Sequence, residues 1–298
     1  MNILEDCTLC PRNCHVNRLA GKTGYCGQTS ELKVARASLH FWEEPCLSGT
    51  SGSGTVFFSG CSLGCVYCQN YSISTGMAGK KITPERLADI FLELQHQKAC
   101  NVNLVTPTHF VPQIIKAIEI SRTKGLYIPV VYNTGGYEKI ETIKRLEGYV
   151  DVYLPDMKYK SQELSRKYSG CPDYFLQASG AIAEMVKLAG KPQFNELGIM
   201  TKGVIVRHLV LPGCIKDSKE ILSHLFHTFG DMIFVSIMNQ YTPLPNAARF
   251  PELNRRLTDD EYDEVVEYAI SLGIENGFIQ EGETASESFI PEFDGFGI

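Results

Sequence analysis

Short apolar runs alternate with longer amphipathic segments from residue 55 towards the end of the chain. The short runs predict strands over the ranges 55–58, 102–105, 127–132, 150–154, 204–211 and 233–238. Between them, apolar side chains recur at helical spacing, as at Val111, Ile114 and Ile118. This spacing predicts helices over the ranges 83–100, 111–124, 138–146, 161–189, 218–229 and 258–272.

The alternation amounts to six strand–helix units. Apolar strands separated by helices are typical of a parallel sheet that helices cover. Six units rather than eight predict an α/β fold with a partial, open-sided (β/α)6 barrel of the TIM type, and a doubly wound sheet is the alternative. In both folds the reactive groups gather at the C-terminal ends of the strands.

Residues 1–54 show little periodicity and predict an irregular, Cys-rich N-terminal extension to a barrel at 55–298. The Gly/Ser run at 48–54 does not match a phosphate-binding loop, because the G-x4-G-K-[ST] pattern and a following helix are missing. We interpret this run as a turn before the first strand of the barrel.

Composition and charge narrow the possible partners. The chain has 298 residues and a formal net charge of -6, without a cluster of Lys and Arg, which argues against nucleic acid and anionic membranes as partners. Its start lacks the pattern of a signal peptide, and no apolar stretch reaches the roughly 18 residues of a membrane span. Eleven cysteines, an odd number, indicate metal or redox chemistry rather than a disulfide framework. We therefore expect a cytoplasmic protein.

Cys61, Cys65 and Cys68 follow the first predicted strand of the barrel in the spacing C-x3-C-x2-C. Three thiolates this close can hold three corners of a 4Fe-4S cube and leave one iron open, whereas ferredoxin-type clusters use a fourth cysteine. A structural zinc site normally takes four protein ligands, so it fits this spacing poorly, and coincidental burial of three cysteines is the remaining alternative. The open iron suggests a site where something is bound and reacts.

Polar residues also follow the later predicted strands, and we expect them to meet the cysteines at one rim. They are Thr106, Thr108 and His109, then Asn133 and Thr134, then Asp156 and Lys158, then Pro212 and Gly213, and finally Asn239, Gln240 and Tyr241. Taken alone, an Asp-x-Lys pair at a strand end is as often a solvated surface pair.

A second cysteine set, Cys7, Cys10, Cys14 and Cys26, lies in the N-terminal extension. Four thiolates close a site, as in a structural zinc site or an electron-transferring cluster, and both metals stay open here. Cys46, Cys100, Cys171 and Cys214 are scattered, and we expect inert, buried thiols there. His40, with Glu43 and Glu44, either anchors the Gly/Ser loop or faces the substrate.

The cysteine spacing, with Tyr67 before the third cysteine, resembles the radical S-adenosylmethionine (SAM) superfamily. Further motifs resemble proteins related to pyruvate formate-lyase activating enzyme. These motifs are Cys7-x2-Cys10-Pro11-Arg12-x-Cys14, Gly24-Tyr25-Cys26-Gly27, His40-x2-Glu43-Glu44-Pro45, Thr106-Pro107-Thr108-His109, Tyr132-Asn133-Thr134-Gly135-Gly136-Tyr137, the segment from Asp151 to Tyr159 and the segment from Arg207 to Gly213.

The resemblance implies a 4Fe-4S cluster on Cys61, Cys65 and Cys68, whose open iron is chelated by SAM. It implies that an electron from a flavodoxin- or ferredoxin-type donor cleaves SAM, and that the resulting 5'-deoxyadenosyl radical abstracts hydrogen. In activating enzymes the target is a glycine of a partner protein. The alternatives are a radical SAM enzyme acting on another peptide or a small molecule, and a non-catalytic iron–sulfur electron carrier or sensor.

The resemblance also implies which residues bind the cofactor: Tyr67, Thr106, Thr108, Asn133, Asp156, Lys158, Arg207 and Tyr241. Two features depart from the family pattern. Thr106-Pro107-Thr108 stands where a Gly-Gly-Glu usually binds the methionine amino group, and Tyr241 stands where His is frequent. These departures affect the substrate and part of the cofactor pocket, and they leave the cleavage chemistry intact.

Overall fold

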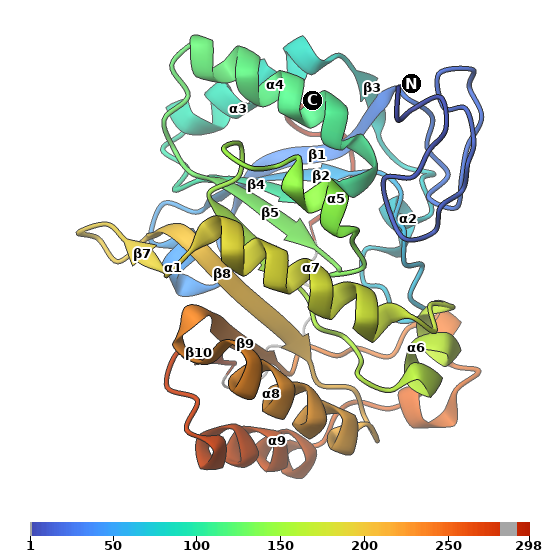
Figure 1. Cartoon of the computed structure of the whole chain (residues 1–298), viewed down its shortest axis with the longest axis vertical. Helices are drawn as coiled ribbons and strands as arrows, with labels where there is room; N and C mark the ends of the chain where they lie inside the picture. Colours follow the sequence, from blue (N-terminus) through green and yellow to red (C-terminus); the bar gives the residue numbers. More distant parts are fainter. Residues whose placement is uncertain (1, 281–290) are drawn as a thin grey trace.

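Seven parallel strands form the centre of the protein (Figure 1). The computed structural model describes residues 2–280 and 291–298. The parallel strands lie side by side in chain order: β2 (Ser53–Phe58), β4 (Val102–Val105), β5 (Val130–Thr134), β6 (Val152–Pro155), β8 (Met200–Leu209), β9 (Phe234–Met238) and β10 (Gly277–Ile279). A doubly wound sheet would reverse its strand order at a switch point. The partial barrel is therefore confirmed and the doubly wound alternative is wrong.

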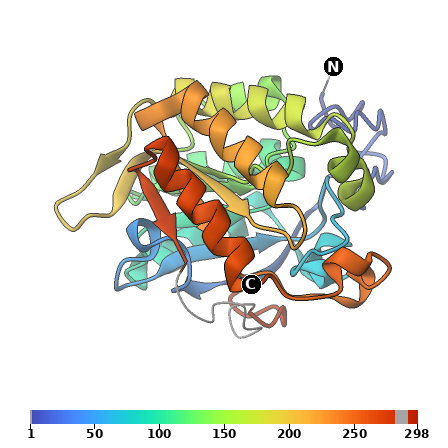
Figure 2. The same cartoon turned by 90° about the horizontal axis from the view of Figure 1, so that it is seen from below.

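Helices cover the outer side of the curved sheet (Figures 1 and 2). The longer ones are α3 (Pro84–His96), α4 (Val111–Thr123), α7 (Tyr174–Ala189), α8 (Ile215–Phe229) and α9 (Asp259–Leu272). Shorter helices are α1 (Pro45–Ser48), α2 (Tyr71–Ser74), α5 (Ile140–Lys144) and α6 (Gln162–Ser169), and short 3-10 turns lie at Thr108–Phe110, Gly230–Met232, Pro245–Ala247 and Pro251–Leu253. The side chain of Thr83 accepts a hydrogen bond from the Arg86 amide, and Thr258 and Glu261 form the capping box that the sequence predicts.

Strand ends differ from the prediction where proline intervenes. The strand predicted at 127–132 lies at Val130–Thr134 in the structure, directly after Pro129. Proline cannot donate a hydrogen bond to a neighbouring strand, so the strand begins after it. As a consequence Asn133 and Thr134 are the last residues of the strand itself, with buried side chains.

The N-terminal extension is only partly irregular. Residues 2–31 contain neither helix nor strand, as predicted. Leu32–His40, however, forms strand β1, which pairs antiparallel with β2 and with β3 (Lys80–Ile82). The barrel sheet thus begins at Leu32, and the prediction of little regular structure up to residue 54 is wrong for this strand. Pairing with β2 stabilises β1, and that contact between segments is not visible in local periodicity.

Helix α1 packs on the inner side of the barrel, next to the first residues of the central strands. Its Cys46 and Leu47 form a buried cluster with Val131, Val152 and Ile205. Strands buried on both faces give most of the remaining core, which runs from β1 to α9. Helix α1 therefore fills the end of the barrel that lies opposite the cysteine loop.

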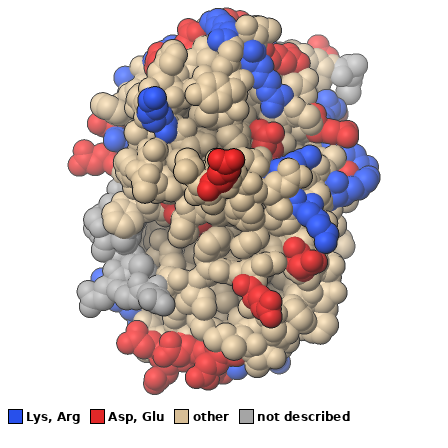
Figure 3. Space-filling view, turned by 90° about the vertical axis from the view of Figure 1, so that its left-hand side faces the viewer, with Lys and Arg blue, Asp and Glu red and all other residues tan. Residues whose placement is uncertain are grey.

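A short hairpin extends from the N-terminal end of β8, where β7 (Gln193–Phe194) pairs antiparallel with the first residues of that strand. Within the described residues, no helix is long and apolar enough to cross a membrane. Figure 3 shows one face of the molecule, where acidic and basic side chains are scattered among neutral ones and the surface is hollowed near the middle.

Candidate active site

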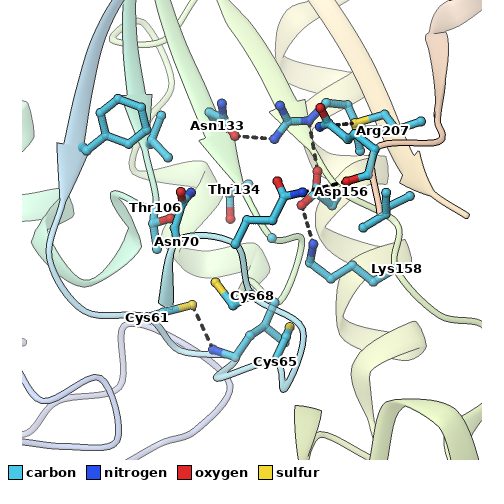
Figure 4. Close-up of a pocket in the computed structure, with 18 of the residues that line it drawn as sticks. Cys61, Cys65, Cys68, Asn70, Thr106, Asn133, Thr134, Asp156, Lys158 and Arg207 are labelled. Carbon is cyan, nitrogen blue, oxygen red and sulfur yellow. Dashed lines mark hydrogen bonds and ion pairs between the residues drawn. The ribbon is translucent and has the colours of Figure 1, made fainter. Parts of the chain in front are cut away.

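A cavity of about 1230 Å³, including the space at its mouth, lies at the C-terminal ends of the parallel strands (Figure 4). Its walls contain the predicted residues Cys61, Cys65, Tyr67, Cys68, Thr106, Asn133, Asp156, Lys158 and Arg207. The four residues of the cysteine loop follow β2, and the others come from the ends of β4, β5, β6 and β8 or from the loops after them. The prediction that polar residues after the strands meet the cysteines at one rim is confirmed for these residues and for Thr134 and Gln240, whereas His109, Pro212, Gly213 and Asn239 are not among the residues that line the cavity.

The cysteine loop forms one wall of this cavity. Strand β2 ends at Phe58, and the backbone amide of Leu63 then donates a hydrogen bond to the Cys61 Sγ over 3.4 Å. Burial, together with the neighbouring Cys61 and Cys65 thiols, raises the pKa of Cys68 to about 12. The Cys61 and Cys68 thiols are thus desolvated, and Cys65 is close enough to contribute to both. The three thiols fit a 4Fe-4S cube, which binds each thiolate at a different iron corner.

A chain of hydroxyl groups supports the middle cysteine from behind. The Tyr67 and Tyr159 hydroxyls lie 2.6 Å apart, the Tyr159 hydroxyl lies 2.8 Å from Ser169 Oγ, and Ser169 donates to Cys65 Sγ over 3.0 Å. Tyr67 is therefore both a wall of the cavity and the first member of this chain. Such hydrogen bonds behind a metal ligand orient it.

Arg12 fastens the N-terminal extension onto the cysteine loop. Its guanidinium donates to the carbonyl oxygens of Ser62 (2.8 Å) and Leu63 (3.1 Å), which lie between the first two cysteines. The same group donates to the carbonyls of Ser169 and Gly170. It also lies 3.7 Å from the ring centroid of Tyr25, whose hydroxyl donates to the Leu63 carbonyl. The extension thus braces the loop that carries Cys61 and Cys65.

Replacing Arg12 by lysine should weaken the attachment of the N-terminal extension to the cysteine loop. An ammonium group cannot reproduce the planar fork that serves several carbonyls at once, so we expect the reconstituted protein to lose iron several times faster and its fold to weaken by about 2 kcal/mol. Iron release to a chelator and urea unfolding measure both effects. The matched control is Arg122→Lys, because Arg122 also donates to two loop carbonyls, those of Gly148 and Tyr149, far from the cavity. Equal iron release from both variants would contradict the assignment.

Charged side chains form the opposite wall. Arg207 Nε lies 3.0 Å from Asp156 Oδ1, and Lys158 Nζ lies 2.6 Å from Asp156 Oδ2. Burial alone would raise the pKa of Asp156, but the Lys158 and Arg207 cations outweigh it and hold that pKa below its ordinary value. Asp156 therefore presents a fixed anion, and the Asp-x-Lys pair lies within the cavity rather than on the solvated surface.

Glu43 joins this charged wall from the segment between β1 and α1. Arg207 Nη1 lies 3.3 Å from its Oε2, and Asn103 Nδ2 donates to its Oε1 over 2.9 Å. Burial raises the pKa of Glu43, while Arg207 and the Asn103 hydrogen bond act against that rise. His40 and Glu43 both line the cavity, and the Glu43 carbonyl also accepts a hydrogen bond from Ser48 in the Gly/Ser run, so both roles considered for this segment stay predictions.

Thr106 lines the cavity in an uncommon backbone conformation. Its φ is +57°, in the left-handed region that β-branched residues rarely adopt. Its amide donates to the Asn133 carbonyl over 2.8 Å, which ties the ends of β4 and β5 together. Backbone strain of this kind is characteristic of functional sites.

Thr108 and Tyr241 lie outside the cavity, in contrast to their predicted role. The Thr108 hydroxyl donates to Glu138 Oε1 over 2.6 Å and accepts from the Tyr132 hydroxyl. The Tyr241 hydroxyl donates to the Leu253 carbonyl over 2.7 Å, and its ring packs against Tyr67. Their polar groups are used within the core, so neither residue is among those that line the cavity.

Glu138, the partner of Thr108, should make stability depend on pH. Burial raises its pKa from 4.5 to about 7, although Thr108 and Thr134 donate to it. The unfolded chain thus releases this proton at lower pH than the folded chain, and the fold loses stability as pH rises from about 4.5 to about 7. Glu138→Gln should flatten this part of the profile in urea unfolding, whereas the exposed Glu163→Gln should leave it unchanged. A profile unchanged by Glu138→Gln would contradict this role.

The N-terminal cysteines are neighbours in the structure. Burial raises the pKa of Cys10 to about 12, with contributions from Cys26 and Cys14, and burial likewise raises that of Cys26, with Cys7 and Cys14 contributing. In residues 2–280 and 291–298, however, no three Cys, His, Asp or Glu side chains converge as they would around one metal ion. The zinc alternative gains no support from this arrangement, and a second metal site stays a prediction.

Two proteins of Methanocaldococcus jannaschii are similar to this chain in sequence. The chain is 33% identical over 279 residues to the uncharacterized protein MJ0674 of Methanocaldococcus jannaschii, covering 90% of this chain and 75% of that protein. A second uncharacterized protein of the same organism, MJ0808, is 24% identical over 298 residues, covering 91% of this chain and 78% of that protein.

Solved structures with a similar arrangement of the chain share little sequence with it. Streptococcus suis SuiB bound to the precursor peptide SuiA matches with a TM-score of 0.49 and 12% identity, over 75% of this chain and 47% of SuiB. The FeFe-hydrogenase maturase HydG of Carboxydothermus hydrogenoformans matches with a TM-score of 0.47 and 14% identity, over 79% of this chain and 59% of HydG. This chain thus spans about half the length of SuiB.

The sequence model described as the Radical SAM superfamily matches residues 55–213, which is more than half of the chain and includes most of the residues that wall the cavity. The cysteine loop after β2 lies at the start of the matched region. By this match, the chain belongs to the radical SAM superfamily.

Proposed function

We propose that this protein cleaves SAM reductively and abstracts a hydrogen atom from a glycine of a partner polypeptide, as glycyl-radical activating enzymes do. The observation that carries this proposal is the placement of Cys61, Cys65 and Cys68 in one cavity with a wall of fixed ion pairs. The motifs that resemble activating enzymes support the choice of a polypeptide as substrate. Membership in the superfamily implies a 4Fe-4S cluster and SAM.

When bound, the cluster supplies the electron that splits SAM into methionine and a 5'-deoxyadenosyl radical, which takes hydrogen from the substrate. The residues of this chain bind the cluster and SAM and shield the reactive intermediate from water. Lys158 lies close enough to Cys61 and Cys68 to favour their thiolates, and its ammonium suits a carboxylate in the cavity. Asp156 and Asn133 provide oxygen atoms for hydroxyl or ammonium groups.

The remaining walls limit side reactions. One part of the cavity is apolar and is lined by Phe57, Val105, Leu209 and Met238. Such a surface keeps water and other hydrogen donors away from a reactive intermediate. We infer a flavodoxin- or ferredoxin-type electron donor, and the cytoplasm remains the compartment that we predict.

Two measurements test the proposal. Anaerobically reconstituted protein with dithionite and SAM should form 5'-deoxyadenosine, and its absence would leave only the non-catalytic carrier or sensor. Electron paramagnetic resonance on mixtures with glycyl-radical proteins encoded in the same genome should then show a glycine-type doublet. Formation of 5'-deoxyadenosine without a doublet on any of them would redirect the search to another peptide or a small molecule.

A further inference from the structure

The C-terminal segment Pro291–Ile298 lies along the edge of β1, beside the cavity. Strand β3 pairs with β1 only from Leu32 to Val34. Beyond that point the C-terminal segment takes its place, with the Gly295 amide donating to the Ala35 carbonyl over 3.1 Å and the Ala37 amide donating to the Phe296 carbonyl over 3.0 Å. The segment thus continues the sheet edge through main-chain hydrogen bonds.

The C-terminal segment also makes packing and hydrogen-bond contacts with side chains of the barrel. The Phe293 ring packs edge-on against Phe57, with centroids 5.3 Å apart, in a cluster that includes Ile73 and Val105. Arg36 donates to the Glu292 carbonyl over 2.8 Å and to the Asp294 carboxylate over 3.1 Å. Phe57 and Val105 also line the cavity, as does Pro291. The segment therefore reaches the wall of the candidate active site.

Two glycines allow the close approach to β1. Gly297 has a φ of +76°, and a Cβ there would lie 2.1 Å from the Ala37 carbonyl oxygen, so another residue would clash with fixed backbone. Gly295 has a φ of +80°, and a Cβ there would meet the flexible end of Lys80 at 2.7 Å. The edge of β1 therefore favours glycine at these two positions of an occupant.

We propose that the edge of β1 is the docking site of the substrate polypeptide, and that Pro291–Ile298 occupies this site until the substrate replaces it. This inference rests on the proposed function. The occupant is an extended, glycine-bearing segment that adds to β1 by main-chain hydrogen bonds. An aromatic residue fills the pocket formed by Phe57, Ile73 and Val105, and an acidic residue pairs with Arg36.

A binding experiment tests the exchange directly. The probe is a fluorescent peptide with the sequence of residues 291–298, titrated into reconstituted full-length protein and into a chain that ends at residue 290. The shortened chain should bind the peptide about tenfold or more tightly, because its site is not already filled. Failure of the folded, shortened chain to bind would overturn the proposal, and circular dichroism checks that it is folded.

Matched peptides test the contacts. A peptide with Phe293→Ala should bind about tenfold or more weakly, since it loses a buried ring, and Gly297→Ala should bind at least as poorly. Phe296→Ala is the control, because the Phe296 ring is 59% exposed, and its loss should be clearly smaller. Equal losses for Phe293→Ala and Phe296→Ala would contradict the pocket assignment.

A full-length variant covers the case in which the shortened chain does not fold. Phe293→Ala in the intact protein weakens the binding of residues 291–298 to β1. The unaltered peptide should therefore bind more tightly to this variant than to the unmodified protein. No gain would overturn the proposal.

Peptide binding does not require SAM cleavage, so the two proposals fail separately. If 5'-deoxyadenosine forms and the peptide does not bind, the docking site is wrong while the cleavage reaction stands. If no 5'-deoxyadenosine forms, the proposed function is wrong, whatever the peptide does.

Discussion

Replacing Cys61 by alanine should abolish 5'-deoxyadenosine formation under a strong reductant. The loop would then offer two thiols instead of three, and a 4Fe-4S cube that already leaves one iron open would lose another protein ligand. We expect the iron content after anaerobic reconstitution to fall. We also expect the amount of 5'-deoxyadenosine to fall below the detection limit of chromatography. Iron analysis and product quantification on the same sample measure the two effects.

Cys100→Ala is the matched control for this prediction. The Cys100 thiol is half-buried and donates to the Ser48 carbonyl over 3.2 Å, outside the cavity. We expect this variant to retain both its iron and its product formation. If Cys61→Ala kept the product at the level of Cys100→Ala, the assignment of the three cysteines to a SAM-cleaving cluster would be wrong.

Replacing Arg207 by methionine should cost about 3–5 kcal/mol of the free energy of unfolding, because buried carboxylates then lose their shared cation. Arg207 contacts Asp156 and Glu43 and also donates to Asn133 Oδ1 over 2.6 Å. Asp156 would keep Lys158, but Glu43 would keep only the amide of Asn103. Urea unfolding measures the loss, and SAM binding should weaken with it.

The Arg207→Met defect should depend on pH. Burial already raises the pKa of Glu43, and removal of the opposing guanidinium raises it further. A carboxyl whose folded pKa exceeds its unfolded value of about 4.3 destabilises the fold wherever it is ionised in the unfolded chain, and this penalty fades as pH falls towards that value. The loss should therefore be larger at about pH 8 than at about pH 5, and Glu43→Gln in the same chain should recover part of it.

Arg86→Met provides the comparison with an exposed ion pair. Arg86 contacts Glu93 on the surface of α3, with 36% and 48% of the two side chains exposed. Such pairs contribute at most about 1 kcal/mol, so this variant should unfold nearly as the unmodified protein does. A loss for Arg207→Met that is equally small, or that is the same at both pH values, would mean that the charged wall does not hold the fold together.

The sequence predicts the barrel and its cysteine site well because both depend on local patterns. Apolar strands and amphipathic helices follow each other along the chain, and Cys61–Cys68 lies within one loop. Thr106, Asn133 and Asp156 are placed correctly for the same reason, since parallel strands bring their ends to one rim. Asn133, Asp156 and Arg207 are predicted separately, and in the structure Arg207 contacts both of the other two.

The structure differs from the sequence-based predictions where contacts join distant segments of the chain. It also differs where the direction of a side chain decides whether the residue lines the cavity. Arg12 reaches carbonyls that lie 50 and 158 residues away, and its motif in the sequence gives no sign of these partners. Thr108 lies in a 3-10 turn that directs its hydroxyl to Glu138 instead of the cavity. Glu43 reaches the cavity because β1 and α1 carry it there. No local pattern in the sequence indicates that the segment Pro291–Ile298 contributes to the cavity wall.

Helix α1, which fills the far end of the barrel, has a consequence for the order of events during turnover. Since Cys46 and Leu47 fill that end, we infer that molecules enter and leave at the rim that carries the cysteine loop. In the proposed reaction, a polypeptide docked on the edge of β1 would narrow the same opening. We therefore expect SAM to bind before the polypeptide, and methionine and 5'-deoxyadenosine to leave after the polypeptide has dissociated. Steady-state kinetics should accordingly show a compulsory binding order, with the modified polypeptide as the first product released.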